Sequence, residues 1–200
     1  MSGRFVVALA LLALLTGGAF AQQPPALRVA GTIESVDGAV LSIKTDKLGV
    51  AKVALTADAA VFGVAKGALA DLKTGAYIGV GATPQADGSQ RAIQVTVFAP
   101  VQRGLGDGHR PWDRPNSTMT NGAVAETVAG VEGPVLTVKY KDGEKKIIVP
   151  PEAVILNYVV GDRSELKSGA HVAIIRAVKK PDGSLEANRV NVGRGEVVPR

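Results

Sequence analysis

The feature that most constrains the fold of this sequence is a phrase that occurs twice. Residues 71–80 read DLKTGAYIGV, and residues 165–174 read ELKSGAHVAI. Three further pairs of segments match at nearly the same separation: 35–44 with 130–139, 52–62 with 146–156, and 87–97 with 182–192. The separation is always 94 or 95 residues, which indicates duplication of a unit of about 70 residues. Because the units are long and there are only two, they predict a pair of domains rather than a solenoid.

Within each copy, apolar residues alternate with polar ones in the period-two pattern of half-buried β-strands. The residues predicted to face inward in the first copy are Leu41, Ile43, Val53, Leu55, Ala76, Ile78, Val80, Ile93, Val95 and Val97. Those predicted in the second copy are Leu136, Val138, Ile147, Val149, Ala170, Val172, Ile174, Val190 and Val192. Asn188 takes the position of Ile93, so the last strand of the second copy is predicted to lack its first inward residue.

Turn residues separate the predicted strands. An Asp-Gly or Glu-Gly pair follows the first strand of each copy, at 37–38 and 132–133, and an Asp-Gly pair precedes the last strand, at 87–88 and 182–183. Since glycine tolerates the positive φ that tight hairpins require, each of these pairs predicts a hairpin.

The first strand of each copy is predicted to carry a β-bulge. Ile33 and Val36 are three residues apart, as are Val128 and Val131 in the second copy. When both members of such a pair face inward, an extra residue intervenes and the strand bends.

Each copy therefore contains five bent strands, with a short connector of helical character after the third. This order is typical of an OB-type barrel. The predicted fold is all-β with short helical connectors, arranged as two tandem five-stranded OB-like barrels. The predicted boundaries are a signal peptide at 1–21, a short N-terminal segment at 22–27, a first β-barrel unit at 28–99, a Gly/Pro-rich linker at 100–121, a second β-barrel unit at 122–193 and a C-terminal tail at 194–200.

The motifs also resemble a known family. The pattern V-x-G-x-(I/V), L-x-(I/V), D-L-K-x-G-x-x-(I/V)-x-V and D-G-S-x-x-A-x-x-V-x-V is similar to that of a bacterial exported domain-of-unknown-function family of small, often tandem, OB-like β-barrel units. The resemblance covers 28–98 and 122–192, although the second copy has TVAG where the first has GTIES. It implies a fold and export, and it supplies no activity and no catalytic residues.

Residues 1–21 have the pattern of a secretory signal peptide. Arg4 precedes an unbroken apolar run at 5–15, and the small residues Ala19 and Ala21 mark a cleavage site before Gln22. The apolar run is too short for a membrane span, which needs about 20 residues. The mature chain is therefore expected to be periplasmic or secreted and to have no transmembrane segment. The sequence contains no cysteine, so no disulfide stabilises it.

The formal net charge of +5 is not concentrated in one region. The segments 28–99, 100–121, 122–193 and 194–200 each carry a net charge of +1. Nucleic-acid binding requires clustered positive charge. The sequence therefore argues against a nucleic-acid partner, and the expected partner is another envelope protein or a small ligand.

The linker has no counterpart in either copy, and two interpretations of it stay open. In the first, it is an irregular connection in which Trp112, the sole tryptophan, packs against a barrel. In the second, it is a ligand site, for which the candidate residues are His109, Arg110, Trp112 and Asp113. A metal version of that site would use Asp107, His109 and Asp113, and an anion version would use Arg110 and Arg114.

No catalytic motif of the G-x-S-x-G, H-E-x-x-H, C-x-x-C or phosphate-loop type occurs in the sequence. His171 takes the outward position of Tyr77, which predicts a surface or interface role. The predicted function is a non-catalytic exported binding or interaction protein that needs no cofactor. The alternatives are a metal- or small-ligand-binding periplasmic protein that uses residues 107–113, and a hydrolase-type enzyme with its site at the linker.

Overall fold

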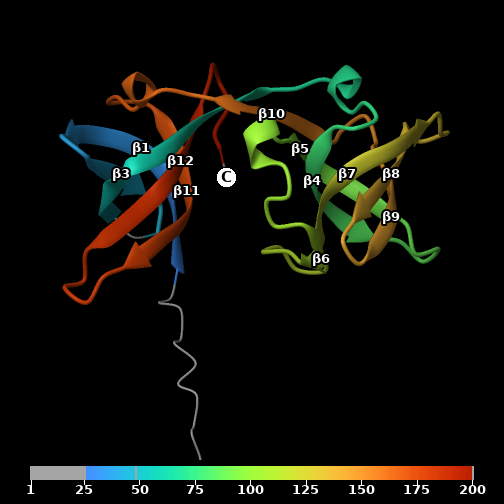
Figure 1. Cartoon of the computed structure of the whole chain (residues 1–200), viewed down its shortest axis with the longest axis horizontal. Helices are drawn as coiled ribbons and strands as arrows, with labels where there is room; N and C mark the ends of the chain where they lie inside the picture. Colours follow the sequence, from blue (N-terminus) through green and yellow to red (C-terminus); the bar gives the residue numbers. More distant parts are fainter. Residues whose placement is uncertain (1–25, 48, 200) are drawn as a thin grey trace, which may run out of the picture.

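The computed structural model describes residues 26–47 and 49–199, which form one continuous hydrogen-bonded sheet of 12 strands (Figure 1). The first strands are β1 (Ala26–Asp37), β2 (Val40–Thr45), β3 (Gly49–Lys66), β4 (Tyr77–Pro84), β5 (Gln90–Val97) and β6 (Gly108–Pro111). The others are β7 (Thr118–Val128), β8 (Val135–Tyr140), β9 (Gly143–Ile148), β10 (Val154–Val160), β11 (His171–Lys179) and β12 (Leu185–Gly193). Short 3-10 helices are η1 (Leu69–Asp71), η2 (Pro100–Gln102) and η3 (Arg163–Glu165).

The structure confirms the predicted all-β class. The described residues include no helix that is both long enough and apolar enough to cross a membrane. The predicted signal peptide and the start of the N-terminal segment lie outside the described residues.

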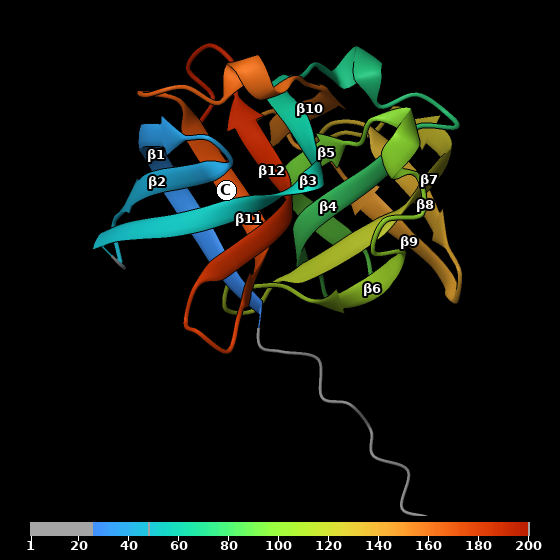
Figure 2. The same cartoon turned by 60° about the vertical axis from the view of Figure 1, so that its left-hand side comes forward.

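The strands close into two five-stranded barrels (Figures 1 and 2). In the first barrel, the pairing runs β1-β2-β3-β12-β11 and returns to β1. In the second barrel, it runs β7-β8-β9-β5-β4 and returns to β7. The pairs β3–β12 and β5–β9 are parallel, and the other pairs within the barrels are antiparallel. Both barrels therefore have the same strand order.

The prediction that each copy closes its own barrel is wrong. The first three strands of the first copy are closed by the last two strands of the second copy, and the reverse holds in the second barrel. The units predicted at 28–99 and 122–193 are therefore sequence repeats and not separate barrels. The physical reason lies in β3, which continues for 18 residues and leaves the first barrel to pair with β10 before the chain turns.

β3 and β10 are antiparallel and meet at a pseudo-twofold axis. Val64 lies opposite Tyr158, its own counterpart in the other copy, and Phe62 lies opposite Val160. β10 also pairs with β5, in parallel, so β12, β3, β10 and β5 form one surface that runs through both barrels. The strand pairing of the molecule is therefore internally symmetric.

The phrase that occurs twice is the segment that exchanges the strands. After η1, the chain enters the second barrel at Gly75, whose N–H donates to the carbonyl oxygen of Val124 at 2.8 Å. After η3, Gly169 donates in the same way to Ile33 of the first barrel at 2.8 Å. Both glycines have φ of 86°, a left-handed conformation that a side chain would strain.

Each barrel has a core that contains residues of both copies. The buried core of the first barrel is Val29, Ile33, Leu41, Ile43, Ala51, Val53, Leu55, Val61, Leu166, Val172, Ile174, Ala177, Ala187, Val190 and Val192. The core of the second barrel is Leu72, Ile78, Val80, Ala82, Ala92, Val95, Val124, Leu136, Val138, Ile147, Val149 and Ile155. Most residues predicted to face inward are among them. Ile93 is an exception, because Ala92 and its counterpart Ala187 take the inward position, and Asn188 therefore replaces no core residue.

The first strand of the second copy was placed incorrectly from the sequence. Val124, and not Val128, corresponds to Ile33, because Val124 lies opposite Val138 as Ile33 lies opposite Ile43. Val128 and Val131 are 46% and 107% exposed. The true separation in this strand is 91 residues, and the loop at 129–134 is four residues longer than its counterpart, so Glu132-Gly133 is not a tight hairpin.

A bulge is present in both first strands, at the predicted position in β1 but closer to the start of the strand than predicted in β7. The register shifts between Ile33 and Ser35 in β1, and between Val124 and Glu126 in β7. β7 begins at Thr118, so the linker ends before the predicted residue 121.

Candidate functional site

The segment 98–117, here called the strap, joins β5 to β7 and covers the outer face of β4. Two glycines of β4 make room for its aromatic rings. A β-carbon on Gly81 would lie 2.4 Å from the indole of Trp112, and one on Gly79 would lie 2.9 Å from the ring of Phe98. Trp112 therefore packs against a barrel, as the linker interpretation predicts. Arg114 lies over the Trp112 ring, with its guanidinium carbon 4.8 Å from the ring centroid.

Asp107 fixes the middle of the strap. The hydroxyl of Tyr77 lies 3.3 Å from both Oδ2 of Asp107 and the carbonyl oxygen of Leu105. The backbone N–H of Lys141 donates to Oδ1 of Asp107 at 2.7 Å. Burial, together with the negative charge of Asp107, raises the pKa of Tyr77 to about 12. Tyr77 is therefore a protonated donor at neutral pH, and both carboxylate oxygens of Asp107 have partners.

His109 lies on β6, the short strand that pairs with β7. Its Nδ1 is 2.8 Å from Oγ1 of Thr120, and its ring stacks on Tyr140 with centroids 6.3 Å apart. Burial lowers the pKa of His109, and the positive charge of Lys145 lowers it further. Both effects favour the neutral form of the imidazole.

The structure does not bring the predicted metal ligands together. Asp113 forms an ion pair with Arg28 of β1 at 3.7 Å, while Asp107 and His109 have the separate partners described above. Within residues 26–47 and 49–199, no group of three or more His, Cys, Asp or Glu residues is placed to hold a metal ion. The metal hypothesis for Asp107, His109 and Asp113 is therefore wrong, because strand pairing and other partners hold these side chains apart.

The predicted anion pair is also divided between different contacts. Arg110 donates to the carbonyl oxygen of Gly106 at 2.8 Å, whereas Arg114 stacks on Trp112. Of the predicted ligand-binding residues, Trp112 packs on β4, Asp113 forms an exposed ion pair with Arg28, and His109 lies at the end of a barrel.

No family model, curated protein or solved structure matches this chain. The two barrels nevertheless provide an internal comparison, because they are built from equivalent strands. Any position where they differ in chemistry is a position where one barrel has acquired a property that the fold itself does not require.

One difference between the barrels lies at the end of the second barrel where β6 is found, opposite the end with η1 (Figure 1). Four equivalent positions there are polar in the second barrel and apolar in the first, as the strand registers show. In the second barrel these residues, here called the polar layer, are Gln90, Thr118, Thr120 and Lys145. In the first barrel, the residues in the same order are Leu185, Leu27, Val29 and Ala51.

Hydrogen bonds connect part of the polar layer. The hydroxyl of Thr118 donates to Oε1 of Gln90 at 2.7 Å, and Thr120 contacts His109. Lys145 is opposite the core residue Val138, so its side chain starts on the inner face of the barrel. We call the polar layer, together with His109 and Tyr140, the strapped end. Sequence reasoning identified His109 but missed the polar layer. Its two threonines were hidden because the separation of 95 residues misaligned the first strand of the second copy.

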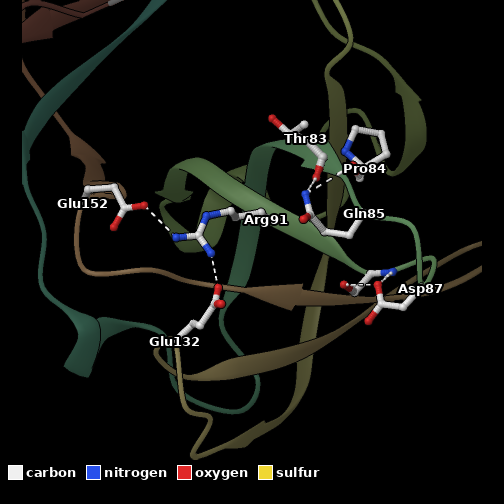
Figure 3. A network of polar contacts seen from close by, with 8 residues as sticks. Thr83, Pro84, Gln85, Asp87, Arg91, Glu132 and Glu152 are labelled. Carbon is white, nitrogen blue, oxygen red and sulfur yellow. Dashed lines mark hydrogen bonds and ion pairs between the residues drawn. The ribbon is translucent and has the colours of Figure 1, made fainter.

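Two open clefts lie elsewhere on the molecule. One, of about 270 Å³, is lined by Thr83, Arg91, Ala92, Ile93 and Glu152. Figure 3 shows that Arg91 reaches Glu132 and Glu152, the latter at 2.9 Å, so this cation is already paired. The other, of about 440 Å³, is lined by Ala59, Ala60, Val61, Phe62, Val101, Val160, Gly161, Asp162 and Arg163. The ion pairs of Arg91 with Glu132 and Glu152 join β5 of the first copy to loops of the second copy.

Gly81→Ala is expected to displace Trp112 from β4, because the new β-carbon would overlap the indole. Since the chain has one tryptophan, its fluorescence emission reports on this contact alone, and the emission is expected to shift to longer wavelength. The free energy of unfolding is expected to fall by about 1–3 kcal/mol. Gly88→Ala, at a turn with no atom within 4 Å of the new β-carbon, is the control. An unshifted emission in Gly81→Ala would contradict the assigned contact.

Proposed function

We propose that this chain is a non-catalytic, exported binding protein that binds its ligand at the strapped end of the second barrel. The observation that carries the proposal is the polar layer, which stands where the first barrel has four apolar residues. In the first barrel, the equivalent strands close with Val29 and Ala51 in the core and Leu185 packed against it, while Leu27 is 40% exposed. The polar residues are therefore not needed for the fold.

Physical chemistry makes such a replacement unfavourable for stability. Burying polar groups is costly unless each finds a partner, and a charged group loses hydration as it becomes covered. Thr120 and Gln90 are buried, and Lys145 is half-buried. With these residues at inward positions, the second barrel lacks apolar packing that the first barrel has at the equivalent positions. Ligand binding is a function that accounts for this loss.

The contacts of the strap favour binding over hydrolysis. Asp107 is held by Tyr77 and Lys141, and Asp113 is held by Arg28. A hydrolase at this position would need a carboxylate free to accept a proton from water or from a nucleophile. We therefore prefer the binding protein to the hydrolase-type enzyme.

The proposal is tested by screening low-molecular-mass fractions of an envelope extract for a rise in melting temperature, since a ligand of the native state stabilises it by mass action. Backbone amide shifts then locate the bound compound. We expect at least one active fraction, with shifts concentrated at 108–111 and 139–146. Shifts confined to the first barrel, or no active fraction, would refute the proposal.

A further inference from the structure

We infer that the strapped end binds a small oxyanion, the carboxylate or phosphate group of a ligand, between Lys145 and His109. The inference rests on the proposed function and names the chemical class of its ligand. It is drawn from the placement of two nitrogen-bearing side chains around one end of the second barrel and from the charge that they leave unbalanced.

Lys145 is the residue that the fold does not explain. Its counterpart in the first barrel is Ala51, a core residue. Several cations of the chain lie beside carboxylates: Arg28, Arg91, Lys180 and Arg194. No such ion pair involves Lys145 among the described residues. A lysine whose stem starts on the inner face of the barrel and whose ammonium group has no counter-charge is a site that an anion would satisfy.

His109 supplies a second hydrogen-bonding group at the same end. Its bond to Thr120 uses Nδ1, which leaves Nε2 for a ligand. The ring of His109 stacks on Tyr140 of β8, and Lys145 lies opposite Val138, two residues earlier on the same strand, so both side chains lie at the same end of the barrel. An anion bound beside both would balance the charge of Lys145 and so favour protonation of the imidazole. Oxyanions form charge-assisted hydrogen bonds with Lys and with a histidine that becomes protonated, and these bonds are stronger than neutral ones.

The neighbours of His109 on the other elements add no competing negative charge. Tyr140 of β8 stacks on the ring, Thr120 of β7 bonds to it, and Lys145 of β9 is positive. On its own segment, Arg110 is positive, and the carboxylate of Asp107 is bonded to Tyr77 and to the backbone of Lys141. Around the imidazole, the two cations Lys145 and Arg110 thus outnumber the one carboxylate, Asp107, and this balance favours an anion.

A purely structural role for the polar layer explains less. Anchoring the strap accounts for Thr120, which bonds to His109, and for the Thr118–Gln90 pair. It does not account for Lys145, whose charge opposes protonation of His109. Replacing Lys145 by Ala, the residue of the first barrel, would leave both hydrogen bonds of the anchor in place.

The experiment is an NMR titration of the two histidine side chains with inorganic phosphate and, separately, with acetate, at constant ionic strength maintained with chloride. The chain contains only His109 and His171, and His171 lies in the first barrel, where it serves as an internal reference. We expect at least one oxyanion to shift the His109 signals saturably and to raise the pKa of His109, while the His171 signals do not change. Saturation by phosphate alone, by acetate alone or by both supports the inference and identifies the preferred group.

Two lysine variants make the test specific. Lys145→Ala is expected to weaken oxyanion binding about tenfold or more, the loss of roughly one charge-assisted hydrogen bond. Lys146→Ala removes the same charge from the neighbouring exposed residue and is expected to bind as the unmodified chain does. The inference would be overturned if Lys145→Ala bound the oxyanion as tightly as the unmodified chain does. It would also be overturned if neither anion produced a saturable shift. An uncharged extract compound that bound at the strapped end would leave the proposed function standing while the inference failed.

Discussion

Gly31→Ala is expected to lower the free energy of unfolding by about 3 kcal/mol or more, one of the largest effects for a single methyl group in this chain. A β-carbon on Gly31 would lie 1.9 Å from the carbonyl oxygen of Lys44, a backbone atom that cannot rotate away. β1 and β2 would have to separate at the point where β1 bends. Urea denaturation monitored by circular dichroism measures the loss.

Gly38→Ala is the matched control for this substitution. Gly38 has φ of 57° and no atom within 4 Å of the new β-carbon, so the expected loss is about 1–2 kcal/mol, from the left-handed backbone alone. Gly122, the counterpart of Gly31, has the same close approach, since its β-carbon would lie 2.3 Å from the carbonyl oxygen of Lys139. If Gly31→Ala were no more destabilising than Gly38→Ala, the close approach of Gly31 to the backbone of Lys44 would be contradicted.

The second large effect is expected from Ile78→Ala, which should cost about 3–5 kcal/mol through lost burial and a residual cavity. Ile78 belongs to the first copy, is 0% exposed, and lies in a core with Leu136 of the second copy. Residues that share a cavity couple, whereas distant ones add. In double-mutant cycles, the losses of unfolding free energy caused by Ile78→Ala and Leu136→Ala are therefore expected to be non-additive. The losses caused by Ile78→Ala and Ile43→Ala are expected to be additive. Coupling with Ile43→Ala instead would place Ile78 in the wrong barrel.

Much of the fold can be predicted from the sequence because it depends on local patterns. Period-two alternation identified Leu41, Ile43, Leu136 and Val138 as inward-facing, and all four are core residues. The Asp-Gly pairs at 87–88 and 182–183 form turns in which glycine has φ of 83° and 85°. These features depend on neighbouring residues alone.

The exchange of strands could not be predicted in this way. The two copies offer equivalent strands, so either closure pairs the same edges and buries the same kinds of side chain. The two possible closures differ in the length of β3 and in the direction of the chain at Lys66. The counterpart of β3 is interrupted after Ile148, near Pro150 and Pro151, and becomes β9 and β10. Proline cannot donate a ladder hydrogen bond, which explains this break.

The candidate site was predicted in part. The sequence indicated an unusual segment around Trp112 and His109, and both have tertiary contacts. The metal version failed because residue types within one loop do not determine which partners their side chains meet. The two threonines of the polar layer depend on the alignment of Gly31 with Gly122, a signal that is present in the sequence but weaker than the repeated phrase.

The strand exchange is tested most directly by disulfide cross-linking, since the chain has no cysteine of its own. Thr32 lies opposite His171, with Oγ1 and Nδ1 3.1 Å apart, whereas a barrel closed within one copy would place Thr32 opposite Tyr77. We expect Thr32→Cys with His171→Cys to form an intramolecular disulfide in the monomer, detected by mass spectrometry, because facing residues suit disulfide geometry. We expect Thr32→Cys with Tyr77→Cys to remain reduced. The opposite result would show that each copy closes its own barrel.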